Sequence, residues 1–137
     1  MQCNSDLKVT DKKISTLSDG ESSMKEMQTF KFGEMIELVK MDYATLHGQI
    51  ELHSNQIFLH IEGFDPSNWS REIYLDMLDV LNETEKYLKK TFGVQQLFVM
   101  IDAADKKLIK FETLFGFFPF YTVTTENGDM LIMFKEI

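Results

Sequence analysis

Residues 97–101 of this 137-residue chain form an unbroken apolar run, Leu-Phe-Val-Met-Ile. A strand with one face in water alternates apolar and polar residues, whereas a strand covered on both faces is apolar throughout. The run therefore predicts the central strand of a sheet. Helical patterns before and after it indicate a mixed α/β fold in which helices pack on the sheet.

The clearest helix is predicted at 70–92, shortly before that strand. Its apolar residues recur with the 3.6-residue period of a helix, and charged residues occupy the opposite side. Ser70 or Ser67 is expected to cap its start, and Gly93 stands where a left-handed residue would end it. The residues expected to face the sheet are Ile73, Tyr74, Met77, Leu78, Val80, Leu81, Leu88 and Phe92.

Further strands and a second helix are predicted around these two elements. Asp105 is expected to cap the second helix, and Gly116 lies just past its end. Asn127-Gly128 is the strongest short signal for a hairpin between the last two strands. We expect one domain, 1–137, with a mixed and mostly antiparallel sheet: a three-strand meander, a helix, a strand, a helix and a C-terminal hairpin. The predicted strands cover 34–42, 44–53, 56–62, 117–125 and 129–136, and the second helix covers about 105–115.

The second and third strands of the meander have a predicted register. Ser54-Asn55 is expected to form a two-residue turn between them. Leu52 would then lie opposite Ile57, and Ile50 opposite Leu59, so that aliphatic side chains stack on one face. The other face would carry His47, Gln49, Glu51, Phe58, His60 and Glu62.

Charge and hydropathy argue against several classes of function. Fourteen basic against twenty-two acidic residues give a formal net charge of -8, which disfavours non-specific attraction to nucleic acid or anionic lipid. No apolar run approaches the ~20 residues that span a bilayer. Residues 1–28 are polar, with a turn expected at 18–22 and at most one short helix after it, and they lack the apolar segment of a signal peptide.

The single cysteine, Cys3, supports neither an internal disulfide nor a thiolate metal cluster, which fits a reducing compartment. We therefore expect a cytoplasmic protein. Two of the three histidines would approach each other across a hairpin, but with no cysteine beside them we expect no metal site. These histidines are His47, His53 and His60.

The order of elements and two stretches resemble the GNAT N-acetyltransferase superfamily. The stretch FGVQQLFVMIDAADKKLIKFETLFGFFPF is similar to the strand-helix-strand end of that family, with its pattern V-x-x-N-x-x-A-I-x-F-Y-x-x-x-G-F. The stretch IFLHIEGFDPSNWSREIYLDMLDVLNETEKYLKK is similar to the preceding strand, pyrophosphate turn and helix. The likeness covers roughly 34–136 and implies a GNAT-like fold. The residues at matching positions of the first pattern are Ile109, Phe111, Gly116 and Phe117.

Three positions depart from the family's pattern. The turn before the long helix has Trp69 and neighbours that all carry a Cβ, where the family has glycines that let backbone amides approach a pyrophosphate. Glu112 replaces the tyrosine that reprotonates the departing thiolate, and an ionised carboxylate cannot donate a proton unless burial raises its pKa. Asp105 replaces an asparagine that contacts the cofactor. We therefore expect that acetyl-CoA chemistry has been lost and that no cofactor binds.

The resemblance still implies roles for residues if the chemistry is retained. Glu62 would be the general base, and Tyr121 or a water molecule the proton source, with Glu112 as a further candidate. The ordinary alternative for Glu62 is a cross-strand pair with His47. The residues expected to hold acetyl-CoA are Ser70, Arg71 and Asp105.

Three aromatic residues are candidates for binding a partner. Trp69 either anchors a partner or plugs the split in the sheet. Alternation would direct Phe118 and Phe120 to one face, and Phe117 and Tyr121 to the other, so either both faces are covered or an apolar patch remains for a protein partner or a second copy.

We therefore expect a degenerate GNAT-fold protein that acts as a binding, inhibitory or assembly component. Its small size suits a phage-encoded protein, located in a host cytoplasm or a virion. The alternative is an active acetyl-CoA-dependent N-acetyltransferase with an unusual turn. A third interpretation, an acidic mimic of nucleic acid, is disfavoured by the interspersed lysines.

Overall fold

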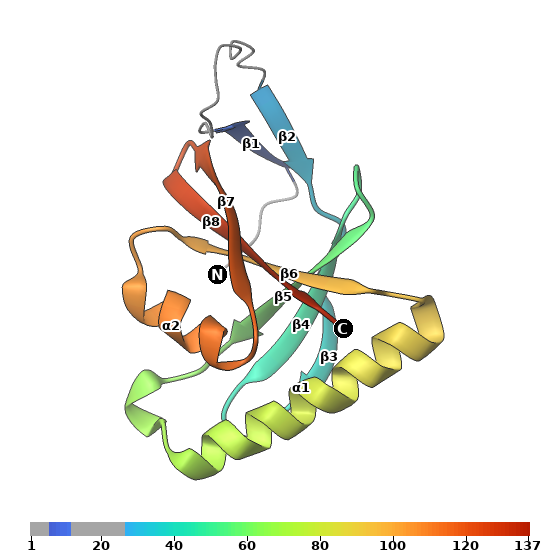
Figure 1. The fold of residues 1–137 in the computed structure, drawn as a ribbon, viewed down its shortest axis with the longest axis vertical. Coiled ribbons are helices and arrows are strands. Elements are labelled where there is room, and N and C mark those ends of the chain that lie inside the picture. Colours follow the sequence, from blue (N-terminus) through green and yellow to red (C-terminus); the bar gives the residue numbers. More distant parts are fainter. Residues whose placement is uncertain (1–5, 12–26) are drawn as a thin grey trace.

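The fold is a single twisted sheet with two helices (Figure 1). The computed structural model describes residues 6–11 and 27–137, with side chains from Phe30 onward. The eight strands follow the order β2-β1-β7-β8-β6-β5-β4-β3. The elements are β1 (Asp6–Asp11), β2 (Met27–Lys31), β3 (Ile36–Lys40), β4 (Thr45–Glu51), β5 (Gln56–Glu62), a 3-10 turn η2 (Pro66–Asn68), α1 (Arg71–Phe92), β6 (Gln96–Asp102), α2 (Lys106–Leu114), β7 (Phe118–Thr125) and β8 (Gly128–Glu136).

The pair formed by β5 and β6 is the one parallel pair among the described strands, and it is short. It joins Ile57 to Leu97 and Phe58 to Phe98, and from there the two strands no longer pair. β6 continues to pair with β8 along its whole length, up to Asp102 with Met130. The sheet is therefore mixed and mostly antiparallel, as predicted, and it is split between the C-terminal halves of β5 and β6.

Two cores lie on opposite faces of the central strand β6. Leu97, Val99 and Ile101 belong to the core against which side chains of both helices pack. Phe98 belongs to an aromatic core on the other face, where it contacts Phe58 with a centroid distance of 5.5 Å. The prediction that this strand is central and buried on both faces is confirmed. Among the described residues, however, the second face is covered by side chains of strands and not by a helix.

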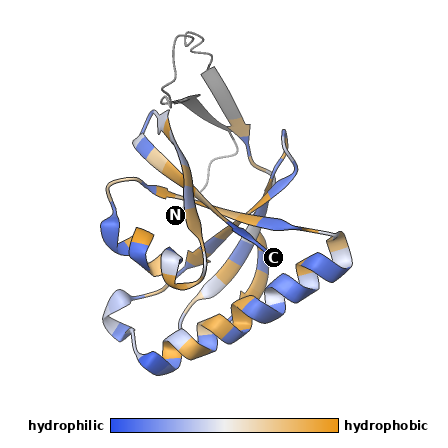
Figure 2. Ribbon diagram, in the orientation of Figure 1, coloured by the Kyte–Doolittle hydropathy of each residue, from blue (hydrophilic) through white to orange (hydrophobic). Residues whose placement is uncertain are grey.

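The predicted caps of both helices are confirmed. The hydroxyl of Ser70 accepts a hydrogen bond from the amide of Ile73, and Gly93 ends α1 with a left-handed φ of 69°. Asp105 caps α2 in the same manner. Bands of hydrophobic and hydrophilic residues alternate along α1 in Figure 2. Its buried residues are Met77, Leu81, Thr84 and Leu88.

Phe92 was wrongly expected to face the sheet. It is 64% exposed and packs on Tyr87, with ring centroids 5.9 Å apart. Phe92 is the last residue of α1, so no further turn of the helix follows it to keep its ring against the sheet.

The predicted register of β4 and β5 is wrong by two residues. Ile50 pairs with Ile57, and Gly48 pairs with Leu59. The cause is a longer turn, which Glu51 holds together: its buried carboxylate accepts hydrogen bonds from the backbone amide and the hydroxyl of Ser54. A shift by two residues keeps the side chains within the paired strands on their predicted faces, but Leu52, which was expected opposite Ile57, lies in the turn and is 50% exposed.

The C-terminal hairpin forms as predicted, but its turn lies one residue earlier. Glu126 and Asn127 form the turn, and Gly128, at φ 109°, is the first residue of β8. Strands β1 and β2 were not predicted; they form a hairpin that pairs with the end of β7. The turn expected at 18–22, and the short helix after it, lie outside the described residues.

Candidate functional site

A groove opens where β5 and β6 cease to pair. It has a volume of about 880 Å³ and lies between β5 with its following turn, β6, and α2. A second cavity of about 40 Å³ lies deeper, between α1 and the sheet. Glu112 lines both cavities. The apolar walls of the groove include Leu59, Ile61, Val99, Ile101, Leu108 and Phe111.

Glu112 is the one carboxyl group that these two cavities share. It lies one helical turn after Leu108, on the side of α2 that faces the groove. None of the described residues donates a hydrogen bond to its carboxyl group or forms an ion pair with it. Burial without such a partner raises the pKa of Glu112 to about 7. With a pKa raised in this way, part of the Glu112 carboxyl groups are protonated near neutral pH, and a protonated carboxyl group can donate a proton.

The turn between β5 and α1 is closed by its own hydrogen bonds. The Asp65 carboxylate accepts from the amide and the hydroxyl of Ser67, and these bonds lower the pKa of Asp65. The amides of Asn68 and Trp69 donate to the carbonyls of Asp65 and Pro66. The amide of Ile73 donates to Ser70. Among the described residues, no acceptor is found for the amides of Ser70, Arg71 and Glu72, which therefore stay open at the start of α1, but the ionised carboxylate of Asp65 lies in the same turn.

Trp69 fills the space over the start of α1. Its ring packs against Phe64 from the turn, Phe111 from α2 and Tyr74 from α1, with centroid distances of 5.9, 5.4 and 6.0 Å. Trp69 is 37% exposed and lines the groove. These contacts favour the interpretation of Trp69 as a plug that joins three elements at one end of the groove.

Of the three residues predicted to hold a cofactor, one lines the groove and two do not. Asp105 lines the groove, but its carboxylate is engaged in capping α2, 3.0 Å from the amide of Leu108. The Ser70 hydroxyl is engaged in capping α1. Arg71 is exposed at the first position of α1 and does not line the groove. The structure therefore brings together Glu112, Asp105 and Trp69.

Glu62 and Tyr121 lie apart from this groove. Glu62 is on the face of the aromatic core, where its carboxylate is 3.5 Å from Nδ1 of His47. Tyr121 packs against the aromatic core, because a bulge between Pro119 and Tyr121 places it beside Phe120, with ring centroids 5.0 Å apart. The expectation that Tyr121 shares a face with Phe117 is therefore wrong.

Three histidines were considered as metal ligands. His47 pairs across the strands with His60, and their ring centroids are 6.4 Å apart. His53 lies beside Glu51, 3.3 Å from its carboxylate. Burial lowers the pKa of His60. Within the described ranges, no three His, Cys, Asp or Glu side chains are grouped so that they could hold a metal ion.

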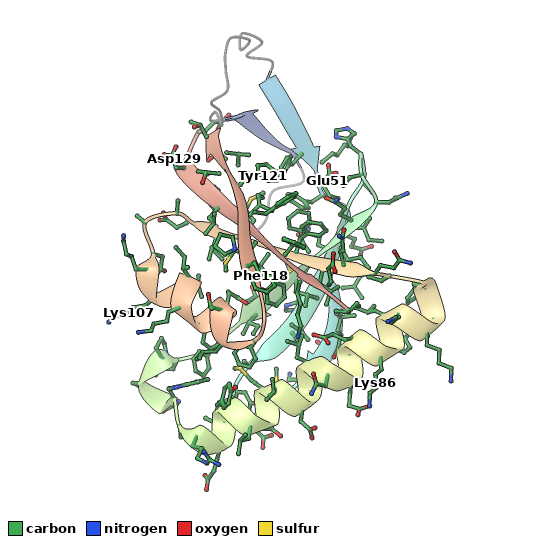
Figure 3. The ribbon with its side chains drawn as sticks, viewed as in Figure 1. Glu51, Lys86, Lys107, Phe118, Tyr121 and Asp129 are labelled. Carbon is green, nitrogen blue, oxygen red and sulfur yellow. The ribbon has the colours of Figure 1, made fainter. Side chains whose placement is uncertain are left out.

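An aromatic patch lies at the start of β7. Phe118 and Phe120 are 59% and 55% exposed, and both rings contact Phe134 of β8. β1 pairs with β7 only from Val123 to Thr125, so in the part of the chain that the structure describes no strand covers the other edge of β7 at this patch. Figure 3 shows Phe118 and Tyr121 on this strand.

Sequence reasoning missed two residues of the site, Phe64 and Phe111. Both make T-shaped contacts with Trp69, and they stack on each other with ring centroids 5.9 Å apart. Phe64 is the second residue after β5, and Phe111 directly precedes Glu112, so the sequence positions of both residues next to the split were the available signal.

Comparison of the sequence with models of known protein families finds no match. A search of curated proteins also finds none. Among solved structures, the chain is similar to one from Bordetella pertussis that is assigned to the GnaT family of acetyltransferases, with a TM-score of 0.53 and 11% identity over 77% of this chain. This chain spans 65% of the length of that structure. The likeness establishes a GNAT-like fold. None of the helices among the described residues is long and apolar enough to span a bilayer.

Proposed function

We propose that this GNAT-like protein acts by binding and does not carry out acetyl transfer from acetyl-CoA. The observation that supports this proposal is the turn before α1, in which the Trp69 ring packs against the edges or faces of both Phe64 and Phe111. A diphosphate bound at a helix start needs free amides and space beside the backbone. Here the ring occupies the space, and the ionised Asp65 opposes the charge of a phosphate.

The test is thermal melting of the full chain with about 1 mM acetyl-CoA. A ligand present at a thousandfold excess over its Kd stabilises a protein by about 4 kcal/mol, and we expect no such stabilisation. Trp69→Gly should gain affinity because it removes the plug, whereas Trp69→Phe, which keeps an aromatic ring there, should not. A clear rise in Tm of the unmodified chain with acetyl-CoA would defeat the proposal.

The aromatic patch of Phe118 and Phe120 is the surface that we propose for a protein partner or a second copy. Its two rings are more than half exposed although they contact a buried aromatic core. Exposed apolar patches of this kind commonly mark interfaces. Phe118→Glu should abolish any self-association seen by analytical ultracentrifugation, and Tyr87→Glu, at another exposed aromatic residue, should not. Equal behaviour of the two variants would assign the interface elsewhere.

The second candidate function is an acetyl-CoA-dependent N-acetyltransferase, and Glu112 is the observation that favours it. A carboxyl group with a pKa of about 7 is suited to proton donation at neutral pH. Since Glu62 and Tyr121 do not line the groove, the proton-donating role would fall to Glu112. Release of free thiol from acetyl-CoA in the presence of primary amines measures this activity, and Glu112→Gln should lower it by about 100-fold or more.

A further inference from the structure

We propose that His47 and His60 form a two-coordinate site for copper(I), on the face of the sheet opposite the two helices. The site is independent of acetyl-CoA binding, because neither Glu112 nor Trp69 takes part in it. Copper(I) would satisfy two imidazole nitrogens that have no other role in the fold.

The two rings lie side by side on neighbouring strands. β4 and β5 are adjacent in the sheet (Figure 1), and His47 pairs directly with His60. Residues directly opposite each other in an antiparallel pair point to the same face, with Cβ atoms about 4.5 to 5.5 Å apart. Leu46 and Leu59, their neighbours in sequence, belong to the core against which both helices pack. Alternation along the strands therefore directs both histidines to the other face.

Each ring has one buried nitrogen atom without a hydrogen-bond partner among the described residues. These atoms are Nδ1 of His47 and Nε2 of His60. A buried polar atom normally has a partner, and the lack of one destabilises the fold. Burial lowers the pKa of His60, so its ring is neutral near pH 7.5. A neutral imidazole nitrogen that carries a lone pair is the commonest metal ligand in proteins.

The separation of the rings fits a linear arrangement. Their centroids are 6.4 Å apart. With a metal–nitrogen distance of about 2.0 Å and a ring radius of about 1.1 Å, a metal ion between two imidazoles holds the centroids about 6.3 Å apart at a straight angle, and about 5 Å apart at a tetrahedral angle. Copper(I) readily takes two collinear ligands, whereas zinc(II) takes four in a tetrahedral arrangement.

The number of donors selects the same metal ion. In the described part of the chain no three His, Cys, Asp or Glu side chains are grouped so that they could hold a metal ion, so zinc(II) would lack the three or four protein ligands that it usually has. Copper(I) needs neither a cysteine nor a third ligand.

The surrounding charges and the exposure of the rings favour a cation. The carboxylate of Glu62 is 3.5 Å from Nδ1 of His47, and Glu37 on β3 pairs with His47 from the other side. The chain as a whole has a formal net charge of -8, which attracts cations. Both histidines are partly exposed, so an ion can reach them from solvent.

The test is transfer of copper(I) to the full chain from bicinchoninate, a chelator that is coloured only when it holds copper(I), at pH 7.5 with ascorbate as reductant. Every chain carries Cys3→Ser, because a thiolate binds copper(I) by itself. The chain should withdraw one equivalent of copper(I). Zinc(II), followed by calorimetry, should give no saturable heat, and zinc(II) binding as tight as that of copper(I) would overturn the assignment.

His60→Gln removes one of the two donors, and it should lower the affinity for copper(I) at least about 100-fold, because two linked donors no longer act together. His47→Gln should have the same effect. His53→Gln is the matched control, because the side chain of His53 is 57% exposed and lies beside Glu51, and it should leave the affinity unchanged.

X-ray absorption of the copper(I)-loaded chain that keeps all three histidines decides the matter if the two variants do not fold. Two nitrogen neighbours without sulfur are expected, and sulfur neighbours would assign the metal to methionines and overturn the inference. No uptake of copper(I), an unchanged affinity in His60→Gln, or an equal loss in His53→Gln also overturns it. Each of these outcomes leaves the proposed function standing, because that proposal depends on melting with acetyl-CoA.

Discussion

Glu112 should make the stability of this protein fall as the pH rises. Its pKa in the folded chain is about 7, against the ordinary value of 4.5 that holds for a solvated glutamate in the unfolded chain. The folded state therefore binds more protons than the unfolded state between these two pH values. By linkage, the stability present at pH 4.5 and below is lost as the pH rises toward and through 7.

The size of this loss follows from the difference in pKa. Each pKa unit corresponds to 1.36 kcal/mol, so the part of the shift that titrates between pH 5 and pH 8.5 amounts to about 2 to 3 kcal/mol. The same energy is absent from Glu112→Gln, which has no proton to lose. His60 and the other titrating groups are shared by both chains, so their contributions cancel in the comparison.

The measurement is urea unfolding of both chains at pH 5 and pH 8.5. The free energy of unfolding of the unmodified chain should decrease, relative to Glu112→Gln, by about 2 to 3 kcal/mol between the two pH values. A difference between the two chains that does not change with pH would refute the reasoning, because it would mean that the carboxyl group of Glu112 is solvated or paired in solution.

Two further predictions concern the framework that holds the groove. Ser70→Ala should lower the free energy of unfolding in urea by about 1 kcal/mol, because the amide of Ile73 loses its acceptor. Thr113→Ala, which removes an exposed hydroxyl within α2, should lower it by less. An equal loss in the two variants would argue against the cap. Leu97→Ala should cost about 2 to 5 kcal/mol, because Leu97 is 0% exposed in the central strand; a loss below about 1 kcal/mol would show that the core collapses around the site.

The elements with strong periodicity could be predicted from the sequence, and the edges of the sheet could not. The periodic pattern of α1 and the apolar run of β6 each result from burial, and buried positions can be recognised from their apolar residue types. β1 and β2 are short strands near one end of the sheet, with charged and polar residues that make them look like loops. Strands near an edge commonly carry such residues because they limit pairing with other chains.

The register of β4 with β5 and the face on which Tyr121 lies both depended on local features. The alternation of apolar and polar residues does not reveal such features. The buried carboxylate of Glu51 fixes the turn between β4 and β5, but a glutamate at a strand end is normally predicted to be exposed. The bulge before Tyr121 moves this residue to the face of Phe120. An extra residue in a strand reverses the alternation after it, so a candidate proton source was predicted on the wrong face.

The position of Glu112 could be predicted, while the packing of Trp69 could not. Glu112 lies in the apolar arc of α2, and a helical wheel is sufficient to place it against the groove. Trp69 contacts Phe111, which is far away in the sequence, at 5.4 Å. This contact exists only because β5 and β6 diverge, so that the turn after β5 and the helix after β6 meet at one end of the split.

The three departures from the GNAT pattern have unequal weight once the geometry is known. Asp105 caps α2, and an asparagine would cap it equally well, so this difference gives little evidence about a cofactor. Glu112 has a pKa of about 7 and retains the ability to donate a proton. The turn is different, because the Trp69 ring occupies the space beside it, although the amides of Ser70, Arg71 and Glu72 have no acceptor among the described residues. Evidence against acetyl transfer therefore reduces to the packing of one indole ring, and Trp69→Gly separates a lost cofactor site from a blocked one.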